Sequence, residues 1–92
     1  MTDVELLKLL KLDLQNPPDA MDPFLRTLLG AAQERITSYG ITLDYGNMSD
    51  VQLVIQYASY LYRLRNSSDG MPRSLQYALH SRLVNEKGGV QS

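Results

Sequence analysis

Cysteine and tryptophan are absent from this chain of 92 residues, and histidine occurs once. Without cysteine there is no disulfide framework and no thiolate metal site, which fits synthesis inside a cell. The lone His80 excludes a multi-histidine metal site within one chain. No apolar run approaches the roughly 18 residues of a membrane span. The first residues are acidic where a secretory signal is basic, so we expect a soluble protein without a membrane partner.

An excess of charge is also missing, since the formal net charge is −1 and the pI is about 5.6. Such a chain has no general affinity for phosphate. The balance hides an asymmetry: residues 1–62 hold four basic groups against eight acidic ones, and residues 63–92 hold five against two. This polarity suits a molecule that packs against its own copies or docks on an acidic partner. The same distribution of charge also fits an ordinary protein surface that is exposed to water.

The content of 43% apolar and 21% charged residues is that of a globular protein, and cap signals predict where its helices lie. Thr2 and Glu5 have the spacing of a capping box, in which each side chain satisfies a free backbone N–H group of the first turn. This predicts a first helix over about residues 3–11. Pro17 and Pro18 remove two backbone donors and exclude a helix after it.

Two further helices follow from similar signals. Asp22 before Pro23 places a capping carboxylate ahead of a proline at the first helical position. The helix that begins there should end at Gly40 in a left-handed cap. Ser49 is the expected cap of a third helix over residues 49–66.

A cluster of turn residues at 66–70 should end the third helix, and Pro72 suits the start of a fourth. Residues 85–92 lack an apolar pattern and are expected to form a flexible tail. The prediction is an all-α fold, a small bundle of about four helices with a long central apolar helix. Residues 1–84 form its single domain.

The third helix carries more apolar residues than one buried face requires. Its first apolar stripe consists of Val51, Val54, Ile55, Ala58, Leu61 and Tyr62, and its second of Leu53, Tyr57, Tyr60 and Leu64. A helix at the surface of a small domain needs one such stripe. Either the other helices of the chain surround this one, or the second stripe covers a neighbouring molecule. Tyrosine is enriched at protein interfaces, so we predict the second stripe as a subunit interface.

Catalytic patterns are not found. Ser81 follows His80 directly, and successive residues of a helix point about 100° apart, so the two do not form a nucleophile–base pair. No phosphate-binding glycine loop and no nucleophile elbow is present. We expect no enzyme activity, no cofactor and no metal.

DNA binding is an alternative that the sequence leaves open. The predicted fourth helix carries Arg73, His80 and Arg82, with Arg63 and Arg65 just upstream. A helix-turn-helix protein has a shorter turn and a more polar recognition helix. The alternative is therefore a small helical DNA-binding regulator that uses the fourth helix and the pair Arg63 and Arg65.

The order of these segments resembles the head–tail connector family of tailed bacteriophages, also called head-completion or adaptor proteins. A leucine-rich first helix ends in Lys11-Leu12-Asp13, and a second helix ends in Tyr39-Gly40. The tyrosine-rich third helix ends in Tyr62-Arg63-Leu64-Arg65-Asn66, and a Gly-Met-Pro-Arg junction at 70–73 leads into the last helix. The resemblance covers about residues 2–84 and rests on patterns and junctions.

This resemblance implies a structural role in the virion neck, at the head–tail interface, after synthesis in the host cytoplasm. Family members assemble into a ring, usually dodecameric, beneath the portal protein. The ring extends the DNA channel without sequence-specific binding and carries a downstream stopper or tail-completion protein. By this analogy Leu53, Tyr57, Tyr60 and Leu64 would contact a neighbouring subunit. Arg73, Arg82 and Lys87 would dock on the portal.

Overall fold

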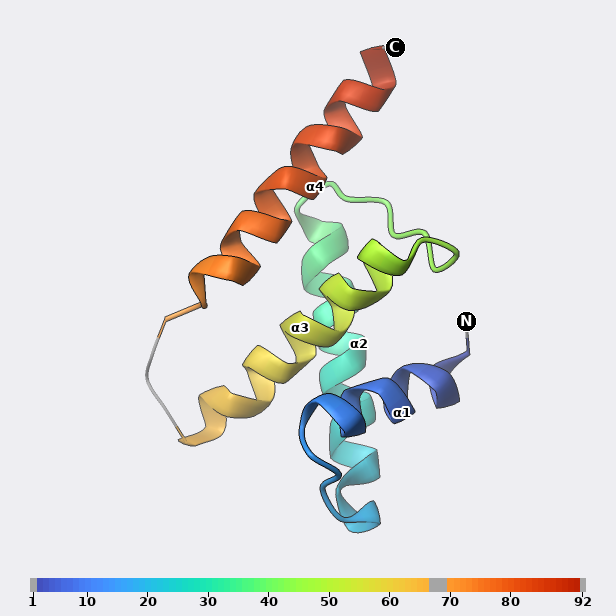
Figure 1. The fold of residues 1–92 in the computed structure, drawn as a ribbon, viewed down its shortest axis with the longest axis vertical. Helices are drawn as coiled ribbons and strands as arrows, with labels where there is room; N and C mark the ends of the chain where they lie inside the picture. The colour runs from blue at the N-terminus through green and yellow to red at the C-terminus, as the bar shows by residue number, and fades with distance from the viewer. Residues whose placement is uncertain (1, 67–69, 92) are drawn as a thin grey trace.

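The computed structural model describes the backbone of residues 2–66 and 70–91, and the side chains of residues 2–65 and 70–86. Within these ranges the chain is all-α and has no strand, as predicted (Figure 1). Its elements are α1 (Asp3–Asp13), the 3₁₀ turn η1 (Asp19–Met21), α2 (Asp22–Ser38), α3 (Met48–Arg63), the 3₁₀ turn η2 (Leu64–Asn66) and α4 (Arg73–Gln91).

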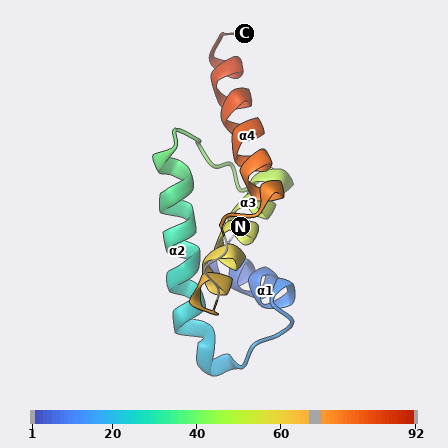
Figure 2. The same cartoon turned by 90° about the vertical axis from the view of Figure 1, so that its left-hand side faces the viewer.

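Helix α3 lies at the centre and contacts each of the other three helices. Helix α2 packs along one side of α3 and α4 lies on the other side, as the two perpendicular views show (Figures 1 and 2). Helix α1 packs on both α2 and α3. The result is a flat molecule with extents of 46 × 30 × 19 Å, in which α4 forms one edge and reaches beyond the other helices.

The core combines residues of all four helices and the α2–α3 loop. Its buried apolar members are Leu6, Leu7, Leu10, Leu25, Leu29, Ala32, Ile36, Ile41, Val51, Leu53, Val54, Ile55, Tyr57, Ala58 and Leu75. Six of these fifteen lie on α3, so the other helices of the chain cover much of the central helix. The first of the two interpretations of its apolar stripes therefore holds for their buried residues, while Tyr60 and Leu64 are partly exposed.

The description of α3 as long and apolar is wrong. At 16 residues it is shorter than α2 and α4, which have 17 and 19. It also carries buried polar side chains, Asp50 and Ser59, and exposed ones, Gln52 and Gln56. The apolar content of its sequence indicated that most of α3 is buried. The buried part of the helix also includes polar side chains.

Two cap predictions are confirmed. The Thr2 hydroxyl accepts from the Glu5 backbone N–H at 3.2 Å, and the Glu5 carboxylate accepts from the Thr2 backbone. Gly40 has a φ of 99° at the end of α2, a conformation that glycine adopts without the cost of a side chain.

Two other caps differ from the prediction. Asp22 does not cap α2, because it is itself the first helical residue, with φ −53° and ψ −46°, and Met21 occupies the cap position. Its carboxylate lies 2.9 Å from the ammonium group of Lys11 on α1. Helix α3 begins one residue earlier than expected, because the side chain of Asn47 accepts from the Ser49 N–H at 2.9 Å and takes the capping role from Ser49.

The end of α4 also differs. The helical backbone continues to Gln91, so the helix does not end at the predicted boundary after residue 84. The flexibility expected of residues 85–92 stays a prediction. Residues 67–69 of the predicted turn cluster lie outside the described residues.

Candidate functional site

Two of the four predicted interface residues are inside the molecule. Leu53 is 3% exposed and Tyr57 is 2% exposed, and the Tyr57 hydroxyl lies 3.0 Å from the hydroxyl of Tyr39 at the end of α2. Neither side chain can contact a neighbouring subunit in this fold. The burial of these two side chains conflicts with an interface role for them, because periodicity shows that a helix face is apolar without showing which molecule covers it.

The other two predicted interface residues lie nearer the surface. Tyr60 is half-buried, with its ring edge-on to that of Tyr57 at a centroid distance of 6.0 Å. Leu64, in η2, is 38% exposed. These residues remain available for a contact at the C-terminal end of α3.

Arg82 is held inside the molecule by four hydrogen bonds. Its guanidinium donates to both carboxylate oxygens of Asp50 at 2.7 and 3.1 Å, to the backbone oxygen of Thr42 at 2.7 Å, and to Glu86 at 2.9 Å. We call these residues the Arg82 cluster. They join α4 to the start of α3 and to the α2–α3 loop, so the predicted portal-docking role of Arg82 conflicts with its engagement here.

The Arg82 cluster neutralises a buried charge. The Asp50 side chain is 1% exposed, and this burial raises its carboxyl pKa. Hydrogen bonds from Arg82 and from the Asp44 N–H at 2.9 Å lower it, and the net pKa of Asp50 is below its ordinary value. The hydrogen bonds from Arg82 to Asp50 conversely raise the pKa of Arg82. Asp50 therefore stays charged, and it fixes the position of α4.

The remaining predicted cationic residues are spread apart. Arg73 is exposed in the first turn of α4, and the Lys87 side chain lies outside the described residues. Arg63 is exposed at the end of α3. The guanidinium of Arg65 lies 4.9 Å from the ring centroid of Phe24 and 5.5 Å from that of Tyr62, at cation–π distances.

The outer face of α4 carries apolar side chains that nothing in the described chain covers. Tyr77 is 73% exposed and Val84 is 52% exposed. Seven residues separate them, so they lie on the same side of the helix. Leu75, Leu79 and Leu83 pack against the core, and α4 therefore has apolar residues on two faces.

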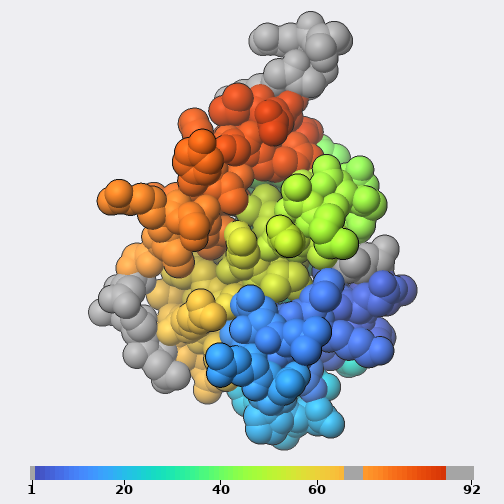
Figure 3. Space-filling view, viewed as in Figure 1, coloured from blue at the N-terminus to red at the C-terminus, as the bar shows by residue number. Residues whose placement is uncertain are grey.

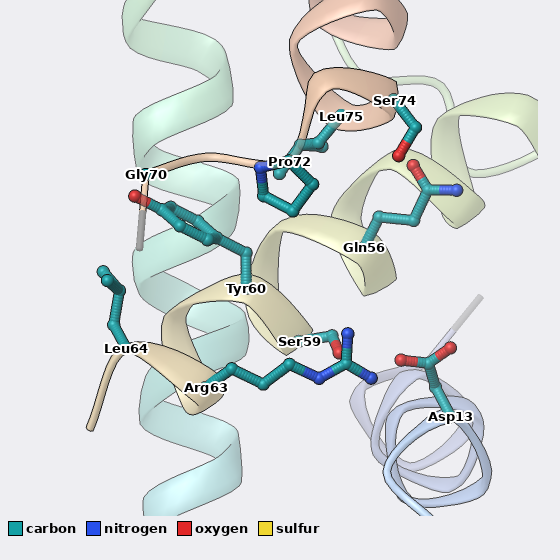
Figure 4. A pocket seen from close by; sticks show the side chains of 10 residues that line it. All are labelled: Asp13, Gln56, Ser59, Tyr60, Arg63, Leu64, Gly70, Pro72, Ser74 and Leu75. Atoms are coloured by element: carbon teal, nitrogen blue, oxygen red, sulfur yellow. The ribbon is translucent and has the colours of Figure 1, made fainter. Parts of the chain in front are cut away.

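A groove follows α3 where α1 and α4 leave it uncovered. Its first part has a volume of about 400 Å³ and lies between the end of α1, the second half of α3 and the start of α4. Figure 4 shows the Arg63 guanidinium extended toward the Asp13 carboxylate across this space. The Ser59 hydroxyl also faces it, and this buried oxygen has no hydrogen-bond partner among the described residues.

The second part of the groove continues along the same two helices. It has a volume of about 340 Å³, and Gln56 lines both parts. In the space-filling view, the surface of α3 is visible between α4 and α1 (Figure 3). We call the two parts together the α3–α4 groove. Sequence reasoning missed it, because Gln52 and Gln56 had only the pattern of a narrow solvated line.

The described residues contain no group of three or more side chains that could hold a metal ion. None of the helices in residues 2–66 and 70–91 has the length and apolar content needed to cross a bilayer. The side chains of the outer α4 face and of the α3–α4 groove can contact another molecule by packing and by hydrogen bonding.

Comparison with models of known protein families, with curated proteins and with solved structures finds no match for this chain.

Proposed function

We propose that this chain is a structural subunit of a phage neck ring, which docks on the portal protein, extends the DNA channel and carries a stopper or tail-completion protein. The proposal rests on the resemblance of residues 2–84 to head–tail connector proteins. A flat subunit with one helix along its edge is a suitable shape for side-by-side packing.

The observation that carries the proposal is the uncovered apolar face of α4. Tyr77 and Val84 are both more than half exposed, although Leu75 and its neighbours already bury the opposite face. Exposed apolar residues that line up on one helix face are typical of a surface that binds another protein. In a ring, this face of one subunit would pack on a different face of the next subunit.

Native mass spectrometry over a concentration series from low to high micromolar tests the proposal, with the full chain alone and with a portal protein. The wild-type chain is expected to form a closed ring of one defined stoichiometry. Val84→Asp and Tyr77→Asp place a charge in the contact, so they should give helical monomers that do not assemble.

Thr27→Asp is the matched control, because Thr27 is exposed on α2, and this variant should assemble like the wild type. Rings formed equally by all four proteins would show that the outer face of α4 is not the contact. A chain that forms no ring, either alone or with a portal protein, would contradict the function itself.

The DNA-binding alternative rests on the exposed residues Arg63 and Arg65, of which Arg65 lies near the rings of Phe24 and Tyr62. It no longer includes Arg82, whose guanidinium is engaged with Asp50. It predicts binding to a DNA duplex that weakens steeply with salt and is lost in an Arg63→Gln/Arg65→Gln double variant. Fluorescence anisotropy with a labelled duplex measures this, and absence of binding near physiological salt would remove the alternative.

A further inference from the structure

The α3–α4 groove is lined along its middle by uncharged side chains that both donate and accept hydrogen bonds. On α3 these are Gln52, Gln56 and Ser59, and on α4 they are Ser74, Ser81 and Asn85. Helical spacing places each set on one side of its helix. The two sets therefore face one another over the length of the groove.

One of these groups lacks a partner. Ser59 is 2% exposed, and its hydroxyl makes no hydrogen bond to any residue that the structure describes. A buried hydroxyl without a partner costs about 1–3 kcal/mol. Figure 4 shows this hydroxyl directed into the groove, where a bound molecule can satisfy it.

The charges of the groove argue against a nucleic-acid ligand. Arg63 at one end faces Asp13, and Arg82 at the other end is neutralised by Asp50 and Glu86. The groove is lined by as many carboxylates, Asp13 and Asp50, as arginines, Arg63 and Arg82, whereas binding of a phosphate backbone needs an excess of cationic side chains. A helical ligand fits poorly as well, because its backbone groups are already paired and it docks through apolar side chains.

An extended peptide has the complementary chemistry, because its backbone presents alternating N–H donors and C=O acceptors. From Ser49 to Arg63 the α3 floor of the groove is about 21 Å long at the rise of an α-helix. About six residues of extended chain span that length. Tyr77 at the rim of the groove offers an aromatic surface to one of their side chains.

We propose that the α3–α4 groove binds an extended, uncharged peptide segment of a partner protein, with Gln56 and Ser59 as the central hydrogen-bonding residues. The proposal does not depend on ring assembly, because these two residues lie on α3, whereas Val84 of the assembly face does not line the groove. Tyr77 lies at the border between the two surfaces.

A random library of displayed seven-residue peptides, selected on the immobilised full chain, tests this proposal. Enriched sequences are synthesised with blocked ends, and their affinities are measured by fluorescence anisotropy. We expect enriched peptides without charged residues at their centre. Gln56→Trp fills the middle of the groove and should weaken their binding by at least about tenfold. Thr27→Trp on the far side of the molecule should bind like the wild type.

Ser59→Ala gives a second, independent measurement. This variant removes one hydrogen bond to the peptide and should weaken binding about three- to tenfold. It should not lower thermal stability, because the lost hydroxyl has no partner in the free protein. Native mass spectrometry of Gln56→Trp separates this proposal from the proposed function, since ring formation should be unchanged.

The proposal is overturned if the selection yields no peptide, if the enriched peptides are strongly acidic or basic, or if they bind Gln56→Trp as tightly as the wild type. An unchanged affinity in Ser59→Ala would remove Ser59 from the site and contradict the proposal in this form.

Discussion

At the scale of single residues, Arg82 is the side chain on which the position of α4 depends most. Replacing it by alanine leaves the Asp50 charge buried without its cationic partner, with the Asp44 N–H as a remaining hydrogen-bond donor. Removing one member of a buried ion pair costs about 3–5 kcal/mol. We therefore expect Arg82→Ala to lower the free energy of unfolding by about that amount, as measured by urea denaturation.

Glu86→Ala is the matched comparison, because it removes the other carboxylate that contacts Arg82. The Glu86 side chain is 27% exposed, so water replaces much of its interaction. We expect a clearly smaller loss than for Arg82→Ala. Equal losses of unfolding free energy in Arg82→Ala and Glu86→Ala would show that the buried ion pair with Asp50 does not stabilise the protein more than the pair with Glu86.

The Arg82 cluster also makes stability depend on pH in the acid range. The pKa of Asp50 is lower in the folded protein than in the unfolded chain, so the unfolded chain takes up more protons as acid is added. The stabilisation is complete above the ordinary carboxyl pKa of about 3.9 and is lost as the pH falls below it. Thermal unfolding from pH 7 to 2.5 should show this decline, with a shallower decline in Asp50→Asn.

Tyr57 makes the stability of the fold decrease as the pH rises in the alkaline range. Burial, together with the hydrogen bond to Tyr39, raises the pKa of Tyr57 to about 12. The stabilisation is complete below the ordinary tyrosine pKa of about 10 and is lost as the pH rises toward the folded value. An ultraviolet titration of tyrosinate should have a last phase near pH 12 that Tyr57→Phe removes. A titration of the wild-type chain that ends near pH 10 would contradict this.

At the scale of elements, the connection after α1 contains two residues in the left-handed conformation, Gln15 at a φ of 65° and Asn16 at 58°. This conformation costs a residue with a side chain about 1–2 kcal/mol, and glycine adopts it freely. We expect Gln15→Gly to raise the free energy of unfolding by about 0.5–1 kcal/mol in urea denaturation. Thr27→Gly within α2 should lower the free energy of unfolding by roughly 0.3–0.5 kcal/mol, and the same sign for both variants would refute the argument.

The elements could be predicted from the sequence wherever the signal is local. The Thr2–Glu5 capping box and the left-handed Gly40 each involve residues within one turn, and both are present in the structure. Asp22 is not the cap, because the 3₁₀ turn η1 leads directly into α2 and makes Asp22 the first residue of the helix. Asp50 and Arg82 are 32 residues apart, so no local pattern relates them.

The candidate site was predicted less well, for a similar reason. The second apolar stripe of α3 was identified correctly as a stripe, but α2 and the other helices cover Leu53 and Tyr57. The α3–α4 groove exists only because α1 and α4 pack on separate parts of α3. Its residues come from three helices, and their proximity depends on the packing as a whole.

At the scale of the whole molecule, the helices differ in how firmly they are attached. Helix α3 contacts all the others, whereas α4 packs mainly on α3 and is held by a few leucines and the Arg82 cluster. In hydrogen exchange, we expect the amides of α3 to be protected most and those of α4 to exchange through a separate, easier opening. Asp50→Asn should speed exchange in α4 more than in α1 or α2. Equal acceleration throughout the chain would show that the molecule opens only as one unit.

The order of the helices along the chain has a consequence for biosynthesis. Helices α1, α2 and α3 are consecutive within residues 3–63, and they supply nearly all of the buried core. On the ribosome, where N-terminal segments emerge first, these three helices leave the ribosome before α4 does. Helix α4 then docks on a surface that already exists, and the pairing of Arg82 with Asp50 completes the fold.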